Sequence, residues 1–501
     1  MAKNSVKPEA NRLAGYAFIT RQFNLQVLPH WHMSEVGGSQ LQKIVEADGR
    51  IREIFPNSYW PGSVRLDHLE FALKYDGINL EILSEVFNKV KIEELAAWIT
   101  SKPQGQYTRR IWYLYEWITG KQLEIADLTK GNYIDLVDKD KYYTTGEQMI
   151  RRQRIRNNLL GNPRFCPIIR RTDTICKFED SDLNAKCRNI LASYPAELLK
   201  RAVSYLYTKE TKSSFAIEHI TPNVSRTERF TSLLQIAEKA DFVNKESLVD
   251  LQNRIVDPRY ADKDYRSNQN YVGETVAWQQ EKIHFIPPQP EDVNDLMEGL
   301  ILSHQRMDSS QVHPVVHAAA IAFGFVFMHP FGDGNGRIHR FLIHNILARR
   351  GFTPAGLIFP ISAAMLNNLD AYDAALETFS KSLIRLIDFT LSEDGQMKVN
   401  NQTSVHYRYP DMTAIAESLF DFIQTTIEKE LVEELNFLKN YDTTKRAIQE
   451  IVDMPDQRID LFIRFCLQNN GILSPKKRKS HFAELTDEEI HKIQDAIQKA
   501  S

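Results

Sequence analysis

A glycine-rich segment near the middle of the chain constrains the fold more than any other stretch of the sequence. Residues 329–340 read His-Pro-Phe-Gly-Asp-Gly-Asn-Gly-Arg-Ile-His-Arg. An apolar run, Val315–Met328, leads into this segment, and apolar residues at helical spacing continue from Ile338 to Ile346. We therefore predict two helices joined by a loop, with the second helix beginning near Gly336.

The predicted loop lies at a helix N-terminus, where the first backbone N–H groups are unpaired and the helix dipole is positive. Gly334 and Gly336 let the main chain approach an anion without obstruction by side chains. Arg337 and Arg340, three residues apart, can each make paired hydrogen bonds to phosphate oxygens. Together these features predict a phosphate site.

Two other residues of the loop indicate what happens to that phosphate. Asp333 places a carboxylate among positive groups, which suits a Mg²⁺ ion shared with phosphates and water. His329 carries a side chain that can accept a proton from an attacking hydroxyl, although a histidine at a helix end is more often a capping or packing residue. The loop thus predicts Mg²⁺-dependent transfer of a phosphate-linked group to a hydroxyl.

Residues 329–340 resemble the signature loop of the Fic domain family, and the resemblance covers roughly residues 195–387. It implies a mostly helical fold that transfers AMP from ATP, with Mg²⁺ as cofactor, to a Ser, Thr or Tyr hydroxyl of a target protein. By this resemblance, His329 is the general base and Asp333 is the metal ligand.

The resemblance also implies the nucleotide contacts of the loop. Asn335 and the amides of Gly334 and Gly336 would bind the α- and β-phosphates. Arg337 would lie near the β-phosphate and Arg340 near the γ-phosphate, in agreement with the phosphate site predicted from the residues alone.

A second feature of the family is an inhibitory helix that precedes the catalytic loop. Residues 213–219 resemble it, because Ser214 stands four residues before Glu218, although His219 stands where the family usually has Gly or Asn. The resemblance implies that Glu218 pairs with Arg340 and obstructs the γ-phosphate. The alternative is that Glu218 is merely an exposed helical carboxylate.

A β-hairpin is expected near residues 268–286, where β-branched and aromatic residues are bounded by Gly and Pro. It resembles the family's flap, which holds the backbone of a target in register by strand addition. In that case four flap residues border the nucleotide: Lys282, Ile283, His284 and Phe285. Tyr372 resembles a family tyrosine near the nucleobase, with packing in the core as its alternative.

The length of 501 residues predicts several folding units, and the expected fold class is mainly α. We expect a mostly helical N-terminal domain of unknown role over residues 1–194. A Fic catalytic domain over 195–391 and a helical C-terminal domain over 392–501 would follow, and the polar stretch Ser392–Ser404 is interpreted as a linker between them.

Composition points to an ordinary globular protein, since 62 basic and 65 acidic residues give a net charge of −3. No global field favours nucleic acid or a membrane. The run Val315–Met328 falls short of the ~20 residues that span a bilayer, and the N-terminus carries no apolar segment of a signal peptide. Four cysteines suit a reducing compartment and are too widely spaced for structural zinc, so we expect a cytoplasmic protein without zinc.

Several interpretations stay open at this point. The basic residues of Arg151–Arg156 favour a solvated helix face or intramolecular ion pairing over nucleic-acid binding. Those of Lys476–Lys479 favour an exposed loop over a DNA-binding module. The loop fixes a diphosphate but says little about the base, so transfer of another nucleotide or phosphate-linked group, or removal of AMP, is an alternative. A third reading is a nucleotide-sensing regulator that binds DNA or a partner. The target protein, self-modification and assembly into a homo-oligomer are not determined.

Overall fold

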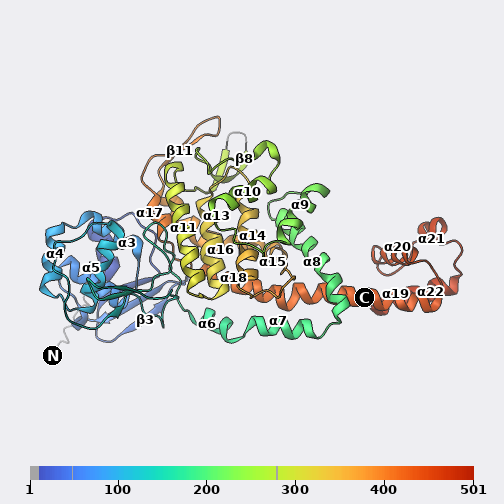
Figure 1. Cartoon of the computed structure of the whole chain (residues 1–501), viewed down its shortest axis with the longest axis horizontal. Helices are drawn as coiled ribbons and strands as arrows, with labels where there is room; N and C mark the ends of the chain where they lie inside the picture. The colour runs from blue at the N-terminus through green and yellow to red at the C-terminus, as the bar shows by residue number, and fades with distance from the viewer. Residues whose placement is uncertain (1–10, 48, 278–279, 501) are drawn as a thin grey trace, which may run out of the picture.

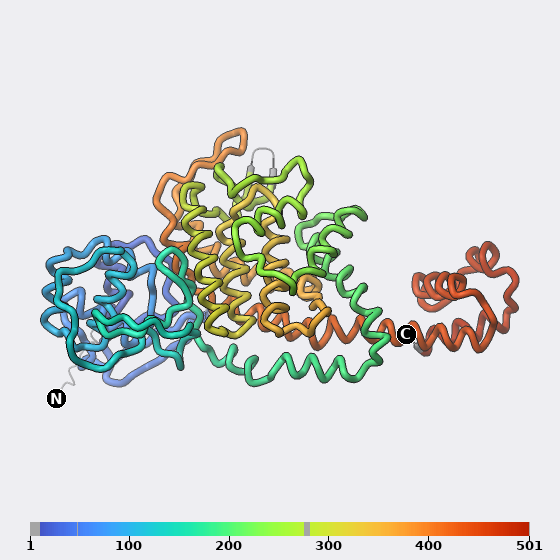
Figure 2. Tube along the Cα trace, in the orientation of Figure 1, coloured from blue at the N-terminus to red at the C-terminus, as the bar shows by residue number. Residues whose placement is uncertain are grey.

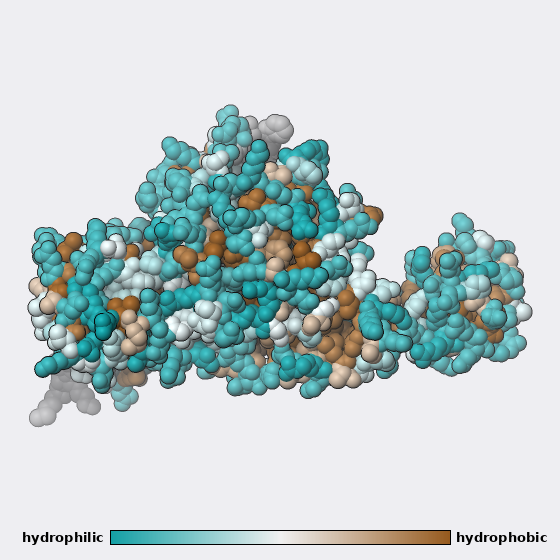
Figure 3. Space-filling view, in the orientation of Figure 1, coloured by the Kyte–Doolittle hydropathy of each residue, from teal (hydrophilic) through white to brown (hydrophobic). Residues whose placement is uncertain are grey.

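The computed structural model describes residues 11–47, 49–277 and 280–500, and helices predominate among them. Figure 1 and Figure 2 show an N-terminal region at one end, a central helical body, and a small helical bundle at the far end of a long helix. None of the helices in the described ranges is both long and apolar enough to cross a membrane. The face drawn in Figure 3 is mostly hydrophilic, with hydrophobic side chains visible over the central body.

The N-terminal region combines helices with two small sheets. Its helices are α1 (Gly15–Phe23), α2 (Arg65–Tyr75), α3 (Leu80–Lys89), α4 (Ile92–Ser101) and α5 (Gln106–Thr119). The first sheet has the order β1-β2-β4-β3, with strands Arg12–Ala14, His32–Gly38, Ile51–Pro56 and Gln42–Val45. The second has the order β5-β7-β6, with strands Ile134–Asp135, Ile155–Asn157 and Gln148–Ile150.

The prediction of a mostly helical N-terminal domain missed these sheets. Strands of two or three residues, such as β5 and β7, are too short to show a period of two in the sequence. The longer strand β3 is exposed at every residue, so its side chains do not alternate between apolar and polar. Strands β2 and β4 are longer, with seven and six residues, but buried and exposed residues do not alternate along them either. Hydrophobic periodicity therefore marks neither sheet.

The basic cluster Arg151–Arg156 lies on the second sheet and its preceding turn, and it is paired within the chain. Arg152 contacts the carboxylates of Glu116 and Asp127. Arg156 contacts those of Asp135 and Glu147. The interpretation of this cluster as intramolecular ion pairing is confirmed.

The central body contains the predicted helix–loop–helix. Before the flap lie α6 (Asp173–Asp180), α7 (Leu183–Ala192), α8 (Ala196–Ala216), α9 (Val224–Leu234) and α10 (Lys245–Ile255). After it come α11 (Pro290–Ser309), α12 (Pro314–Ala318), a π-helical turn (Ala319–Phe323), α13 (Gly324–Met328), α14 (Asn335–Arg349), α15 (Ile361–Asn367) and α16 (Leu369–Leu383). The run from α12 to α13 is continuous, so the helix predicted over Val315–Met328 is confirmed.

The flap is an antiparallel hairpin of β8 (Val272–Ala277) and β9 (Gln280–Phe285), as predicted. It stands at the upper edge of the central body in Figure 1. Phe285, at the end of β9, is buried against Phe327 of α13 and Phe379 of α16. The base of the flap is thereby anchored on α13, which leads into the glycine-rich loop, and on α16.

The core of the central body extends past both boundaries that we expected, at 194/195 and 391/392. Ile175 on α6 and Leu183 on α7 belong to it, and so do Ile415 and Leu419 further along the chain. The proposed linker contains β11 (Met397–Val399), which pairs with β10 (Phe389–Leu391) just before the linker, and the Met397 side chain is buried. The linker interpretation is wrong, because Met397 and Val399 pack in the core. The sequence did not show this, since the neighbours of these two apolar residues are polar.

After the hairpin come α17 (Ser404–Arg408), α18 (Thr413–Thr425), a π-helical turn (Thr426–Glu430) and α19 (Leu431–Ile451). The distal bundle consists of α20 (Asp456–Leu467), α21 (Pro475–His481) and α22 (Asp487–Ala500), and it has its own apolar cluster. The residues Lys476–Lys479 lie on α21 and do not form the expected loop. Ser474 caps that helix by accepting a hydrogen bond from the Lys477 amide.

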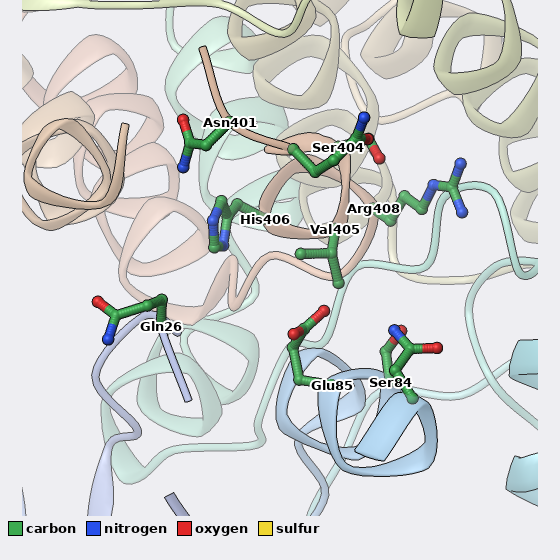
Figure 4. A pocket seen from close by; sticks show the side chains of 10 residues that line it. Gln26, Ser84, Glu85, Asn401, Ser404, Val405, His406 and Arg408 are labelled. Carbon is green, nitrogen blue, oxygen red and sulfur yellow. The ribbon is translucent and has the colours of Figure 1, made fainter. Parts of the chain in front are cut away.

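A cleft of about 360 Å³ lies where the N-terminal region meets the segment that includes α17. Figure 4 shows Gln26, Ser84 and Glu85 on one side of it, with Asn401 and Ser404 on the other. His406 of α17 hydrogen-bonds to the buried carboxylate of Glu81 at 2.6 Å. None of the residues that line this cleft belongs to the glycine-rich loop, so the loop has to be described by itself.

Candidate active site

Local backbone geometry forms the glycine-rich loop between α13 and α14. His329 ends α13 in the left-handed conformation, with a φ of 47°, and its amide donates to the Phe325 carbonyl. Gly334, with a φ of 88°, precedes the first residue of α14. The side chain of Asn335 accepts from the Phe331 amide and donates to the Phe331 carbonyl. Asn335, expected at the phosphates, thus uses its side chain to close the loop.

The imidazole of His329 is oriented as a base. Its Nδ1 lies 3.1 Å from the Val326 carbonyl, which can only accept, so Nδ1 carries the proton and Nε2 keeps a free lone pair. Desolvation lowers the pKa of His329 to about 4. The hydrogen bond to Val326 raises this pKa in part, and the nearby charge of Arg266 lowers it further. His329 is therefore neutral at physiological pH.

The two arginines of the loop both point at one carboxylate. Glu218 follows the end of α8, and its Oε1 lies 2.6 Å from Nη2 of Arg340. Its Oε2 lies 2.9 Å from Nε of Arg337. Both guanidinium groups are almost completely buried, whereas the Glu218 side chain is 24% exposed. The pairing of Glu218 with Arg340 that we expected is present, and Glu218 also pairs with Arg337.

The same carboxylate sits against the start of α14. A Cβ atom placed on Gly336 would lie 2.6 Å from Glu218 Oε1, so the absence of a side chain at Gly336 makes room for the carboxylate. The first turn of a helix attracts anions through its free amides and its dipole. Glu218 thus occupies the anion cradle that the sequence predicts for a phosphate.

The segment 213–219 holds Glu218 in this place. Ser214 accepts a hydrogen bond from Arg340 Nε at its hydroxyl, 2.8 Å, and from Arg340 Nη2 at its carbonyl, 2.7 Å. His219 turns the chain with a φ of 55°, a left-handed conformation in which His is tolerated and Gly or Asn is preferred. Burial, the largest single effect, would lower the pKa of Arg340, but the charges of Glu218 and Tyr372 and the hydrogen bonds to them together raise that pKa.

Asp333, the expected metal ligand, is more than half exposed. Its Oδ1 accepts from the Gly334 amide at 2.6 Å and from Nη2 of Arg337 at 2.9 Å. No group of three or more His, Cys, Asp or Glu side chains that could hold a metal ion is found among the residues described. The Asp333 carboxylate therefore lies beside the cradle, on its solvent side.

The flap and Tyr372 are placed differently from one another. Lys282 and His284 are exposed and contact Glu274 across the hairpin, at 3.1 and 3.3 Å. Ile283 is partly buried and packs on the core of the central body. Tyr372 is buried beside Arg340, and its pKa is raised by burial. Of the two interpretations of Tyr372, packing in the core is the one that its burial favours.

Sequence reasoning missed the residues that support the loop from behind. Arg266 donates from Nε to the His329 carbonyl, 2.8 Å, and Asp262 accepts from the Gly332 amide, 3.0 Å. Both lie in the polar stretch between α10 and the flap, where no periodic or motif signal marks them. Only the folded arrangement brings them to the loop.

Comparisons with known proteins match the residues that form this site. The model of the Fic/DOC family matches residues 242–347, which include the flap and the glycine-rich loop. A protein adenylyltransferase Fic of Culex quinquefasciatus is 35% identical over 125 residues, covering 24% of this chain and 22% of the relative. One of Nematostella vectensis is 29% identical over 203 residues, covering 34% and 45%. The chain therefore spans less than half the length of each of these relatives.

Solved structures of the same family also align. A Fic family protein from Desulfovibrio desulfuricans covers 55% of this chain, with 80% of its own chain aligned, at 18% identity and a TM-score of 0.37. At that TM-score the superposition supports no further comparison. The family match includes the helix–loop–helix that holds His329 and Arg340. Over residues 242–347 the chain is therefore similar to proteins of the Fic/DOC family.

Proposed function

We propose that this chain transfers AMP from ATP to a hydroxyl side chain of a target protein, and that Glu218 holds the activity down. The observation that carries the proposal is the pairing of Glu218 with both Arg337 and Arg340 at the start of α14. Two buried arginines converge there on an anion, and the anion present is a carboxylate of the same chain. When it leaves, the free cradle fits the phosphates of a nucleotide.

The chemistry follows from the position of His329 next to this cradle. A target hydroxyl would attack the α-phosphorus, and its proton would pass to Nε2 of His329, which is neutral and has a free lone pair. The bond from the α-phosphorus to the bridging oxygen would break, so pyrophosphate leaves. Arg337 and Arg340 would stabilise the charge on the departing phosphates.

The donor set fits Mg²⁺ as cofactor. A nucleotide-bound Mg²⁺ takes most of its ligands from phosphates and water, so one exposed carboxylate, that of Asp333, meets what the protein has to supply. The ion would neutralise charge on the phosphates when bound. Arg337 is paired with both Asp333 and Glu218. Once Asp333 binds the ion and Glu218 leaves, Arg337 would be free to bind a phosphate.

The relatives support AMP as the group transferred, since they are named protein adenylyltransferases. In the proposed complex the amides of Gly334 and Gly336 bind the α- and β-phosphates and the exposed flap residues Lys282 and His284 border the nucleotide. A cytoplasmic location, self-modification, a homo-oligomer and nucleic-acid binding stay predictions from the sequence.

Mass spectrometry of the full-length Glu218→Gly protein, incubated with ATP and Mg²⁺ and a panel of candidate targets, tests the proposal. We expect the mass of AMP on a Ser, Thr or Tyr residue, absent from the Glu218→Gly/His329→Ala double variant. The same mixture with UTP or CTP distinguishes transfer of another nucleotide. No added mass on any protein, together with no ATP binding by the Glu218→Gly protein, would contradict the proposed function.

A further inference from the structure

The segment of residues 262–270, which we call the brace, runs along the catalytic loop and bonds to its main chain at four successive residues. The pairs are Arg266 Nε to His329 O (2.8 Å), Arg266 N to Pro330 O (2.8 Å), Asn270 Nδ2 to Phe331 O (3.1 Å) and Gly332 N to Asp262 Oδ2 (3.0 Å). The brace therefore forms a template for the first part of the loop.

Arg266 also bonds to both ends of the flap. Its Nη1 donates to the carbonyl of Asn268, just before the hairpin, at 3.0 Å. Its Nη2 donates to the carbonyl of Pro288, just after the hairpin. One guanidinium group thus ties the peptide of the catalytic His329 to the two stems of the flap.

The surroundings of Arg266 suit this linking role better than a role in charge pairing. The residue is only 8% exposed, and no carboxylate of the described residues lies within 4 Å of its guanidinium. Burial lowers the pKa of Arg266 to about 10, so the group stays protonated at neutral pH. A planar head with donors pointing in several directions reaches three separate carbonyls at once, which a lysine head cannot do in the same geometry.

We infer that Arg266 is a positioning residue that couples the flap to His329, so that a target strand held by the flap is presented to a correctly placed base. The inference rests on the proposed AMP transfer and names a residue in that site beyond the loop itself. Arg266 touches neither the nucleotide cradle nor Glu218. Its loss should therefore disturb transfer and leave the binding of ATP nearly unchanged.

The test compares Arg266→Met and Arg266→Lys in the Glu218→Gly background, in the full chain. A displacement of reacting groups by about 1 Å can cost a hundredfold in rate, so we expect the Met variant to lose about tenfold to hundredfold in transfer. The Lys variant, which keeps the charge and part of the bonding, should recover a portion of the loss. ATP affinity, measured by calorimetry with Mg²⁺, should change by less than about threefold, since the cradle residues are untouched.

Hydrogen exchange gives a readout that does not depend on activity. In both variants we expect faster exchange at the amides of His329, Phe331 and Gly332 and, together with them, in strands β8 and β9. The exposed Arg259, seven residues before Arg266, is paired with Asp257, and Arg259→Met serves as the matched control. That control should change neither the exchange of these amides nor the transfer.

The outcomes separate this inference from the proposed function. If the Glu218→Gly parent transfers nothing, the proposed function fails, and the exchange experiment still decides the coupling. If Arg266→Met does not fold, Arg266→Lys decides alone, with slower transfer and joint loss of protection as the supporting result. The inference is overturned if the folded variants show the same transfer rate and the same hydrogen exchange as the parent. It is also overturned if protection is lost only in the loop or only in the flap.

Discussion

The carboxylate of Glu210 on α8 accepts a hydrogen bond from Nε2 of His344 on α14, at 2.7 Å, in a site closed to solvent. Its second oxygen accepts from the amide of Ser362 on α15, at 2.9 Å. Helix α8, which ends just before Glu218, is thus fastened to α14 one turn before Ser214. This buried anchor lies just before the segment that holds Glu218 against Arg337 and Arg340, the contact that we propose to be inhibitory.

Removal of that anchor should loosen α8 and raise basal transfer. Glu210→Ala leaves His344 and Ser362 without their buried partner, a change that typically costs about 3–5 kcal/mol in unfolding free energy. We expect a lower melting temperature together with increased labelling by α-phosphate-tagged ATP. Glu197→Ala, an exposed substitution in the first turn of the same helix, should change neither. Reduced labelling by a folded Glu210→Ala protein would count against the anchor.

Substitution of Glu218 should make stability depend on nucleotide. In Glu218→Gln the buried guanidinium groups of Arg337 and Arg340 lose their shared anion, and we expect a loss of about 3 kcal/mol without ligand. Mg²⁺-ATP should then raise the melting temperature of this variant more than that of the parent, because phosphates replace the carboxylate. Calorimetric scans with and without ATP check this. An equal rise in both proteins is the contrary result.

Gly336 should tolerate no side chain, even when Glu218 is gone. A Cβ at this position points at the place where the Glu218 carboxylate lies, 2.6 Å from Oε1. In the Glu218→Gly background, Gly336→Ala should therefore weaken ATP binding by about tenfold, equivalent to about 1.4 kcal/mol. Gly146→Ala, where a Cβ would meet only the Ser310 hydroxyl at an ordinary 3.5 Å, serves as a comparison for stability. Unchanged ATP affinity in Gly336→Ala would place the phosphates elsewhere.

The acid limit of the reaction should lie well below that of an ordinary histidine. Because desolvation lowers the pKa of His329 to about 4, the imidazole stays unprotonated as the pH falls from 7.5 to about 5. Initial rates of the Glu218→Gly protein should therefore be nearly flat over that range and fall only as the pH approaches 4. A decline centred near pH 6.5, in protein that circular dichroism shows to be folded, would contradict this assignment.

Chelation of the metal should remove transfer and weaken nucleotide binding. EDTA is expected to abolish labelling by the Glu218→Gly protein, and added Mg²⁺ should restore it. Asp333→Asn keeps the size of the side chain but loses its charge, so we expect a higher Mg²⁺ concentration for half-maximal labelling. Titrations of Mg²⁺ at fixed ATP measure the shift. The same Mg²⁺ requirement in both proteins would remove Asp333 from the metal's ligands.

The part of the site that the sequence predicts is the part built from neighbours in the chain. His329, Gly334 and Arg340 belong to one loop, and helical spacing alone places Arg337 and Arg340 at the start of α14. The contact of Glu218 with Arg340 spans 122 residues, and only the family resemblance suggested it. Arg266 could not be found, because 63 residues separate it from His329 and no pattern marks its polar surroundings.

The fold divides in the same way. The helical period of apolar residues predicts long amphipathic helices such as α18 and α19. The Gly and Pro residues at its boundaries predict the flap. The hairpin of β10 and β11 has strands of three residues each, with Met397 and Val399 as its buried side chains. Packing against the central core, rather than local preference, determines its position. Elements whose position is determined by tertiary packing are difficult to predict from a single sequence.

Since Glu218 is part of the same chain as the cradle, the inhibition that we propose would be that of a tethered competitor, whose effective concentration does not change when the protein is diluted. ATP then binds only to the fraction of molecules in which the carboxylate has left. If that fraction is about one in a hundred, the apparent dissociation constant for ATP rises about a hundredfold. The ATP concentration of the surroundings, and not the amount of enzyme, would then determine how much of the chain is active.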